Sequence, residues 1–392
     1  MAKARTINDV IPVFRPSMGQ EEIKAATEVI KSGWIGLGPR TEQLEKDFAK
    51  YVNAKYAVGL NSATAALHLS LLALKIGESD EVLVPSLTFV STAHAVLYVG
   101  AKPVFVDVDE KTLCMDPRDL EAKITKKSKA IIPVHYGGHP VDLDAVHRIA
   151  HKYGLKVIED ASHATGAKYK NKMIGGLSDI TCFSFHAVKN LATPDGGMTT
   201  TNEKDIAEKI RNLRWVGITK NTWEREELVA EKGYHNYGWY YDVTELGFKY
   251  HMNDIAAAIA QIQLKNLEKL NRKRAILTKR YNQKLQKFKW LKTPQVMPWA
   301  KSAHHNYVIR TPYRDKLNLF LKDKKISSGV HYMPIHHFTY YIKNKLGAKV
   351  PVTERVWKGL LTLPLYPDLT FKQQDFIIDA ISQFSKNHVK KV

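Results

Sequence analysis

A single lysine, Lys189, stands between an apolar stretch and a pair of glycines in FSFHAVKNLATPDGG, residues 183–197. The apolar part is typical of a buried strand, and Gly196 and Gly197 allow the backbone to turn tightly behind the lysine. Lys189 is therefore either a solvated loop residue or a nucleophile at the edge of a sheet. A lysine attacks only as the neutral amine, so the second role requires a site that lowers its pKa.

The turn NSATAAL, residues 61–67, joins a short apolar strand to a helix. Its small residues leave backbone N–H groups free, and the start of a helix attracts anions, so a phosphate would fit against Ser62, Ala63 and Thr64. The same residues are also typical of a plain Ser/Thr helix cap. The turn alone does not decide between a phosphate site and a cap.

Three further side chains follow apolar stretches. Asp160 ends VIED and would form either a structural salt bridge or a contact with a protonated ring nitrogen. Phe89 would either enter the core or stack on a planar ligand, and His163 would be a core histidine or a ligand contact. Together with Lys189 and the phosphate turn, these residues match the needs of pyridoxal phosphate (PLP). They would supply a Schiff-base lysine, an aspartate that keeps the pyridine nitrogen protonated, and a phosphate cradle.

The elements that must position these residues alternate between helix and strand. Short β-branched strands separated by amphipathic helices indicate a mostly parallel sheet, whose ligands bind at the carboxyl ends of the strands. The side chains above should therefore converge. Strands are predicted within residues 56–60, 81–89, 102–109, 130–138, 155–162 and 179–186. Helices are predicted within residues 21–33, 41–52, 61–77, 90–100 and 144–154.

The length of 392 residues favours two domains. We predict a large cofactor-binding domain with an N-terminal arm over residues 1–265, and a connecting helix with a smaller C-terminal α/β domain over residues 266–392. The second part should contain the following elements. A long helix is predicted over residues 253–285, strands near 304–311 and 327–333, and a terminal helix over 372–384.

The composition limits the class of protein. A net charge of +20 favours anionic partners, either nucleic acid or phosphorylated small molecules; no RNA-binding signature is present, and we favour the small molecules. No apolar run is long enough to cross a bilayer, and no secretory signal begins the chain, so we expect a cytoplasmic protein with no membrane partner. Cys114 and Cys182 form no metal-binding spacing and no disulfide framework, and we predict no metal site.

Several spaced motifs resemble, in order, the DegT family of nucleotide-sugar aminotransferases. They include SGWIGLGPRTEQLEKDF, NSATAALHLSLLAL, VPSLTFVSTAHAVLYVGAKPVFVDVD, EDASHATGAKYKNKMIGGLSDITCFSFHAVKN and LGFKYHMNDIAAAIAQIQL. The resemblance covers nearly the whole chain, and SFHAVKN resembles in particular the members that form UDP-4-amino-4-deoxy-arabinose. It implies the fold of type I PLP-dependent transferases.

The resemblance also implies roles for individual residues. Lys189 would be the Schiff-base lysine, Asp160 the partner of the pyridine nitrogen, and Phe89 the ring stacked on the cofactor. His163 would lie near the other face of the cofactor or its 3-hydroxyl group. The implied phosphate contacts are Ser62, Ala63, Thr64 and Ser184.

One position departs from many relatives. His251, in KYHMND, stands where they have an asparagine that reaches the cofactor phosphate of the neighbouring subunit. A histidine can still donate a hydrogen bond to phosphate. We therefore expect a homodimer with shared active sites. Substrate contacts are expected from Trp34, His331 and His336, although these rings could equally be core or domain-interface residues.

The resemblance predicts an aminotransferase that moves the amino group of glutamate to a keto-sugar linked to a nucleoside diphosphate. We favour a 4-keto sugar and a pathway to cell-surface polysaccharide such as lipopolysaccharide, or to related amino sugars. Two alternatives stay open: a PLP-dependent deoxysugar dehydratase, whose relatives carry histidine in place of Lys189, and a regulatory protein that binds nucleic acid. A dehydrogenase would need a glycine-rich dinucleotide motif, which GLNSATAAL is not.

Overall fold

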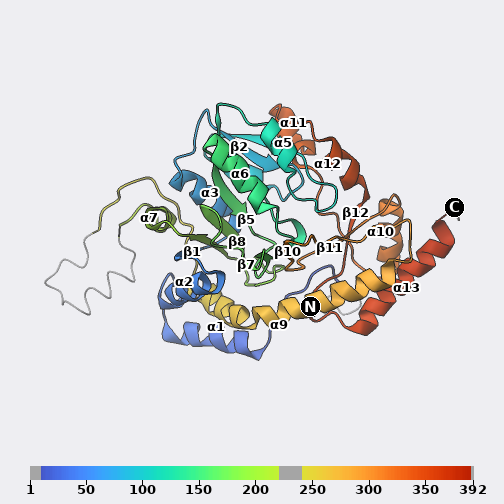
Figure 1. Cartoon of the computed structure of the whole chain (residues 1–392). Helices are drawn as coiled ribbons and strands as arrows, with labels where there is room; N and C mark the ends of the chain where they lie inside the picture. Colours follow the sequence, from blue (N-terminus) through green and yellow to red (C-terminus); the bar gives the residue numbers. More distant parts are fainter. Residues whose placement is uncertain (1–9, 220–240, 390–392) are drawn as a thin grey trace.

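A central sheet of seven strands forms the body of the chain, and the computed structural model describes residues 10–219 and 241–389 (Figure 1). β9 runs antiparallel to both β1 and β8, and the other strand pairs are parallel, which confirms the predicted mostly parallel sheet. The strand order is β1 (Tyr56–Leu60), β9 (Gly197–Thr201), β8 (Ile180–Ser184), β5 (Lys156–Asp160), β4 (Ser128–Ile131), β2 (Glu81–Pro85), β3 (Lys102–Val106).

Helices cover both faces of this sheet because successive strand residues point to opposite sides. Val157 joins one core cluster and Ile158 the other. The first face is covered by α2 (Pro39–Val52), α5 (Pro117–Ala122), α6 (Leu143–Tyr153) and the start of α9 (Asp254–Leu285). The second face is covered by α3 (Ala63–Ala73), α4 (Ser91–Tyr98) and α7 (Lys204–Arg214). α1 (Gln20–Ser32) packs on α9 and ends at Gly33, as predicted.

A third core cluster lies around the second half of α9, which crosses from α2 to the C-terminal part of the chain (Figure 1). It contains Leu277, Tyr281 and Leu285 of that helix, so the long helix serves both parts. Its other elements are β11 (Tyr307–Arg310), β12 (Leu360–Leu363), α10 (Arg314–Asp323) and α13 (Phe371–His388). α11 (Thr339–Lys343) and α12 (Pro351–Val356) lie between β11 and β12 in the sequence.

The predicted strand near residues 327–333 is wrong. β11 pairs with β12 instead, and the 327–333 segment touches the sheet only through a bridge between Gly329 and Thr362. Beyond that bridge the chain turns inward, where the His331 carbonyl accepts a hydrogen bond from the Tyr136 hydroxyl. A segment that leaves the sheet for the interior cannot continue the strand ladder.

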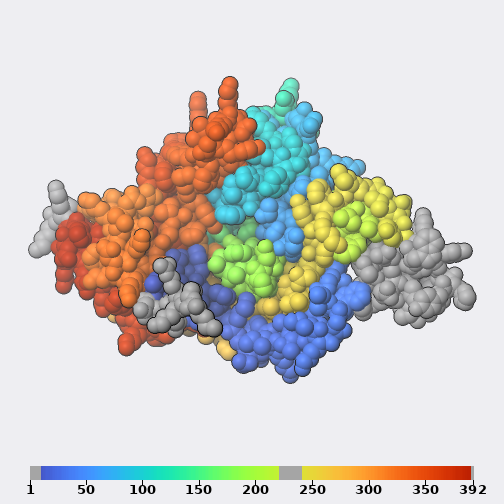
Figure 2. All heavy atoms as spheres, turned by 180° about the vertical axis from the view of Figure 1, so that it is seen from behind, coloured from blue at the N-terminus to red at the C-terminus, as the bar shows by residue number. Residues whose placement is uncertain are grey.

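The N-terminal arm lies against the C-terminal part. Ile11 forms a bridge to Ile326, and the Val13 carbonyl accepts a hydrogen bond from Leu365 N at 3.1 Å. Seen from behind, these first described residues, in dark blue, lie between the orange C-terminal part and the green segments (Figure 2). The predicted division at residue 265 falls inside the unbroken α9, and we retain it as a proposal. Residues 1–9 of the arm and residues 390–392 lie outside the described residues.

The described residues bear on two predictions, one about the cysteines and one about membrane-spanning segments. Cys114 and Cys182 are both buried and unpaired, so the described chain contains no disulfide between them. Among the described helices, none is long and apolar enough to cross a membrane.

Candidate active site

The carboxyl ends of the parallel strands bring the predicted residues to one edge of the sheet. Ser62 follows β1, Phe89 follows β2, Asp160 ends β5, and Lys189 follows β8. β5 and β8 are neighbours, with Asp160 opposite Cys182 in the register. β9, which was not predicted from the sequence, starts at this edge and lies between β8 and β1. The Lys189 loop therefore joins two neighbouring antiparallel strands, β8 and β9.

Lys189 is half-buried in the turn after β8, and its backbone N–H donates to the His186 carbonyl at 2.8 Å. Burial lowers the pKa of the Lys189 amine to about 8, against an opposing pull from the negative charge of Asp160. An exposed loop lysine would keep a pKa near 10.4. The surroundings therefore favour the nucleophile over the solvated loop residue.

Asp160 is only 4% exposed. Its carboxylate accepts hydrogen bonds from the Thr92 hydroxyl at 2.8 Å and from Ser162 N at 3.1 Å. Within the described residues it forms no ion pair, so the structural salt bridge considered from the sequence is absent there. A buried carboxylate that forms no ion pair is costly. Such a group suits a ligand that brings its own positive charge, as a protonated pyridine nitrogen does.

The Phe89 ring is not a core residue, because 57% of its surface is exposed. Its centroid lies 6.1 Å from that of Tyr332, at an interplanar angle of 52°. An aromatic ring left open at the edge of the sheet where Lys189 and Asp160 also lie can stack on a planar ligand. The arrangement supports the stacking role rather than the core alternative.

The turn before α3 forms the predicted phosphate end of the site. Ser62 is the helix cap, and its hydroxyl accepts a hydrogen bond from Ala65 N at 3.1 Å. Ala63 is the first residue of α3, and the Thr64 hydroxyl donates to Ser91 Oγ at 2.8 Å. Capping and phosphate binding are compatible here, because one side chain satisfies only one of the free N–H groups at the helix start.

Gly197, at the start of β9, passes directly beside this turn. A Cβ atom there would lie 2.4 Å from the Ser62 carbonyl carbon, so only glycine allows β9 to approach the phosphate turn so closely. Ser184, at the end of β8, is buried, and its hydroxyl accepts a hydrogen bond from His186 N at 3.4 Å. The strand ends thus bring Ser62 and Ser184 to the two sides of Gly197.

His251 lies beside the same turn of its own chain, where it forms a bridge to Leu60. Its Nδ1 atom is buried and has no hydrogen-bond partner among the described residues. Burial and the nearby charges of Lys249 and Arg214 lower the pKa of His251 to about 4. The neutral ring therefore keeps one unsatisfied nitrogen near the phosphate end.

His163 is buried between two rings. It stacks on His305 with centroids 4.4 Å apart, and its Nε2 lies 3.0 Å from the Tyr332 hydroxyl. Burial and the charges of Lys189 and His331 hold the pKa of His163 well below its usual value, so it is neutral. His163 is close enough to Lys189 for the charge of the lysine to lower its pKa, which is consistent with the predicted position of His163 near the cofactor.

His331 belongs to the same group, and Trp34 lies in another part of the chain. Burial and the charge of Lys189 lower the pKa of His331 to about 4, and its Nδ1 lies 2.8 Å from Thr362 Oγ1. Trp34 lies in the connection between α1 and α2, where its indole N–H donates to the Leu37 carbonyl at 3.0 Å. Its substrate role remains a prediction.

His336, the third predicted substrate contact, lies elsewhere. Its Nδ1 is 2.6 Å from Ser86 Oγ, and its Nε2 is 2.7 Å from Glu354 Oε1. Both ring nitrogens already have partners, and in the described chain neither of them contacts Lys189. This arrangement gives no support to a substrate role for His336.

Four residues of the site were not identified from the sequence. Tyr332 contacts His163, and Thr92 contacts Asp160. The rings of Phe14 and His305 stack in parallel, with 5.5 Å between their centroids. Tyr332 directly follows His331, a predicted substrate contact, but was not itself predicted. No local pattern distinguishes the other three from ordinary core residues.

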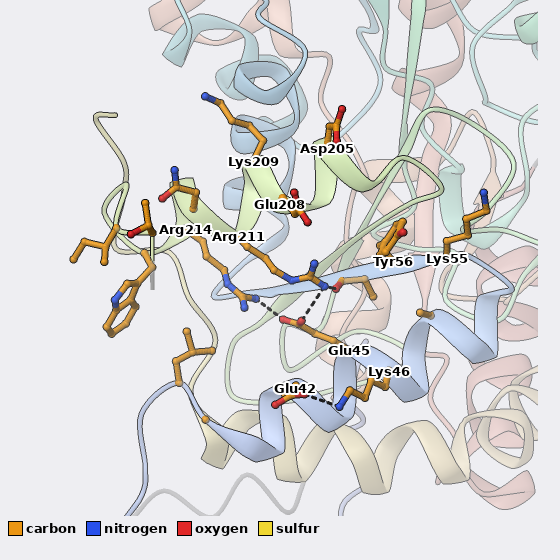
Figure 3. Close-up of a pocket in the computed structure, with 18 residues that line it drawn as sticks. Glu42, Glu45, Lys46, Lys55, Tyr56, Asp205, Glu208, Lys209, Arg211 and Arg214 are labelled. Carbon is orange, nitrogen blue, oxygen red and sulfur yellow. Dashed lines mark hydrogen bonds and ion pairs between the residues drawn. The ribbon is translucent and has the colours of Figure 1, made fainter. Parts of the chain in front are cut away.

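A cavity of about 920 Å³ lies between α2, β1 and α7, and Lys189 is not among its lining residues. Figure 3 shows Arg211 and Arg214 directed at Glu45 in this cavity. Glu45 also accepts a hydrogen bond from Gly59 N at 2.8 Å, and Arg214 donates to Gly59 O at 2.7 Å. These contacts join α2 to β1 and α7, which is a structural role.

The site at Lys189 fits PLP on these observations. It offers an amine of lowered pKa, a buried carboxylate that forms no ion pair among the described residues, an open aromatic ring, and a helix start with free N–H groups. Lys189 would bond to the cofactor, Asp160 would hold its ring nitrogen, Phe89 would lie on its ring, and Ser62 and Ser184 would bind its phosphate.

Comparison with known proteins gives the family. The DegT/DnrJ/EryC1/StrS aminotransferase family matches residues 16–382. The chain belongs to this family. The spore coat polysaccharide biosynthesis protein SpsC of Bacillus subtilis is 42% identical over 389 residues, which cover 97% of this chain and 98% of SpsC.

Solved structures with a similar fold agree with this family assignment. Spr1654 from Streptococcus pneumoniae in its PLP form has a TM-score of 0.89 and 30% identity, covering 97% of this chain and 100% of that one. The sugar aminotransferase CalS13 from Micromonospora echinospora has a TM-score of 0.85 and 27% identity, covering 95% and 99%. As a member of the DegT family, the chain is a PLP-dependent aminotransferase with the type I transferase fold.

Proposed function

We propose that this aminotransferase moves the amino group of glutamate to a keto-sugar linked to a nucleoside diphosphate, with carbon 4 as the aminated position. The observation that carries the reaction type is the half-buried Lys189, with a pKa of about 8, beside Asp160. The substrate class is supported by the name of SpsC, a spore coat polysaccharide biosynthesis protein, and by CalS13, a sugar aminotransferase. The product would enter a cell-surface polysaccharide, such as lipopolysaccharide, or a related amino sugar.

PLP, when bound, withdraws electrons from the carbon that loses its proton. Lys189 Nζ is the base that removes the proton from the α-carbon of glutamate, and in the second half-reaction it delivers a proton to the sugar carbon that receives the amine. A pKa of about 8 leaves part of the amine neutral at pH 7, so Lys189 can act in both directions. Asp160 accepts a hydrogen bond from the Thr92 hydroxyl at this end of the site. The neutral rings of His163 and His331 add no competing positive charge.

The open side of the site suits a second subunit. A cavity of about 660 Å³ reaches Ser62 from outside and is also lined by Ile35 and Met252. We propose a homodimer in which His251 of one chain approaches the phosphate end of the other. We further propose that Trp34 and His331 contact the sugar nucleotide, and that the enzyme works in the cytoplasm.

A panel of nucleotide-linked 3-keto and 4-keto sugars tests the substrate. We expect conversion of glutamate to 2-oxoglutarate to depend on a 4-keto sugar nucleotide. Conversion only with 3-keto sugars would contradict the carbon assignment. Activity with free keto acids but with no sugar nucleotide would contradict the proposed substrate class.

Two alternatives are separated by further readouts. Loss of a sugar hydroxyl without transfer of nitrogen would indicate a dehydratase. The net charge of +20 would also favour binding of nucleic acid, so duplex DNA is added as a competitor. We expect the sugar nucleotide to bind unaffected by DNA, and displacement by DNA at equal concentration would favour the nucleic-acid alternative.

A further inference from the structure

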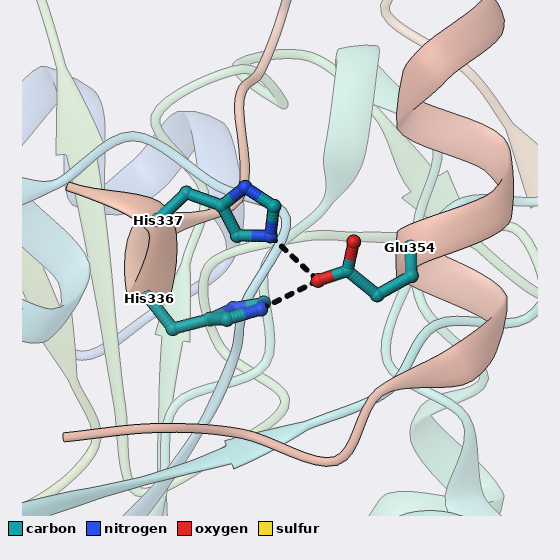
Figure 4. Close-up of side chains that lie close together, drawn as sticks. All are labelled: His336, His337 and Glu354. Carbon is teal, nitrogen blue, oxygen red and sulfur yellow. Dashed lines mark hydrogen bonds and ion pairs between the residues drawn. The ribbon is translucent and has the colours of Figure 1, made fainter. Parts of the chain in front are cut away.

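His336, His337 and Glu354 bring three ligand atoms to one point outside the site of Lys189. His336 Nε2 and His337 Nε2 lie 2.7 and 2.6 Å from the same carboxylate oxygen, Glu354 Oε1. All three atoms lie within 4.8 Å of one another. Figure 4 shows the two rings, from adjacent residues of one 3₁₀ turn, directed at the glutamate of α12 from different sides.

The rings are held in this orientation by further contacts. The His336 side chain is 9% exposed, and its Nδ1 lies 2.6 Å from Ser86 Oγ. The second oxygen of Glu354 accepts a hydrogen bond from the Trp357 indole N–H at 3.4 Å. Metal-binding histidines usually carry such a partner on their other nitrogen, because it fixes the ring and the position of its proton.

We propose that His336, His337 and Glu354 bind one divalent transition-metal ion, and that Zn²⁺ suits the set best. Two imidazole nitrogens and one carboxylate are a common ligand set for zinc, with water as the fourth ligand. Glu354 and His337 are about one-third exposed, which leaves room for that water. No metal site was predicted from the sequence, because the two cysteines have no metal-binding spacing and Glu354 is distant in the sequence from the His336–His337 pair.

Small movements are enough to admit the ion. Tetrahedral Zn²⁺ with bonds of 2.0–2.1 Å places neighbouring ligand atoms about 3.3 Å apart. The present contacts of 2.6 and 2.7 Å must therefore open by roughly 0.6 Å, which the partly exposed Glu354 side chain can provide by rotation. Each neutral ring would carry its proton on Nδ1, and for His336 that proton faces the Ser86 oxygen.

The ion would fasten the segment that carries active-site residues. His336 and His337 follow His331 and Tyr332 by only a few residues, and Ile335 N donates to Ser86 O at 2.9 Å. Glu354 belongs to α12, so the metal would tie this segment to a separate helix. We therefore assign the ion a stabilising role and no part in the transfer of the amine.

Titration of the holoenzyme with Co²⁺, after removal of free PLP, tests the proposal. Tetrahedral Co²⁺ reports through its visible absorption bands, so we expect those bands to saturate at one ion per chain, with Zn²⁺ displacing the cobalt. His337→Gln and Glu354→Gln should each weaken Co²⁺ binding at least about tenfold. His151→Gln, the same change at an exposed histidine of α6, is the control and should bind Co²⁺ as the unchanged protein does.

A second measurement does not depend on the colour of cobalt. A ligand that binds only the folded state raises the melting temperature, so Zn²⁺ should raise it for the unchanged protein and for His151→Gln. His337→Gln and Glu354→Gln should melt at a temperature that Zn²⁺ does not change. Co²⁺ bands that are absent, or that persist unchanged in both variants, would overturn the site even if the proposed transfer of amine to a sugar nucleotide is measured.

Discussion

The Tyr332 hydroxyl lies 3.0 Å from His163 Nε2, although 169 residues separate the two in the sequence. Gly137 N donates to His163 Nδ1 at 3.4 Å, so the neutral ring carries its proton on Nε2 and donates it to Tyr332. Burial and the negative charge of Asp160 raise the pKa of Tyr332, which therefore keeps its own proton. That proton remains available to a ligand in the site.

Replacing Tyr332 with phenylalanine tests this contact. Tyr332→Phe keeps the ring beside Phe89 but leaves the buried N–H of His163 without an acceptor. An unsatisfied buried donor costs about 1–3 kcal/mol, and we expect the free energy of unfolding in urea to fall by that amount. Tyr340→Phe, at a tyrosine that is 54% exposed, is the control and should change nothing. Equal stability of both variants would show that the hydrogen bond is not made.

The pKa of Lys189 predicts how fast the apoenzyme takes up PLP at different pH values. Below pH 8 the amine is mostly protonated and does not attack, so the rate of covalent attachment should rise about fivefold from pH 7 to 8 and level off above it. His331, with a pKa of about 4, does not titrate in this range. Asp160→Asn should move the midpoint to lower pH, because Asp160 favours the protonated amine. A midpoint near 10.4 would contradict the lowered pKa.

Removal of the amine should abolish turnover without loss of the fold. Lys189→Ala should still bind PLP through Ser62 and Asp160, but without the yellow colour of the covalent form. Borohydride reduction of the unchanged holoenzyme, followed by peptide mapping, should place the adduct on Lys189. An adduct on any other lysine would contradict the assignment.

Asp160→Asn is nearly isosteric and should keep the hydrogen bond from the Thr92 hydroxyl. The amide cannot hold a protonated ring nitrogen, so the half-reaction with glutamate should slow by more than tenfold, which corresponds to about 1.4 kcal/mol in the barrier. Stopped-flow absorbance of the holoenzyme mixed with glutamate measures this step. A change below threefold would mean that Asp160 does not hold the cofactor nitrogen.

Shared active sites can be tested by mixing two inactive variants. Lys189→Ala and His251→Ala chains, unfolded and refolded together, should form dimers of which half are mixed, so about a quarter of all sites would combine an intact Lys189 with an intact His251. We expect activity to return to about that level, measured as 2-oxoglutarate formation. No recovery, with subunit exchange confirmed, would place His251 at the cofactor of its own chain. Full activity of His251→Ala alone would show that His251 has no role at either site.

Much of the fold follows from the sequence by itself. Alternating helical and β-branched stretches predict the parallel strands. Asp160 and Lys189 follow from their places at the end of VIED and after CFSF. Because parallel strands end at one edge of their sheet, a local pattern is enough to bring these two residues together. The cofactor follows as well, because an amine, a carboxylate and a helix start are chemically specific.

Other features depend on packing between distant segments. Three features are properties of surfaces that meet only in the folded chain. They are the exposure of Phe89, the absence of an ion pair of Asp160 within the described chain, and the convergence of His337 on Glu354. The segment at residues 327–333 has a strand-like sequence, yet it leaves the sheet after the bridge between Gly329 and Thr362, and its His331 carbonyl accepts a hydrogen bond from Tyr136. Sequence periodicity indicates which face of a helix or strand is apolar. It does not indicate which other element packs against that face, and these contacts depend on that packing.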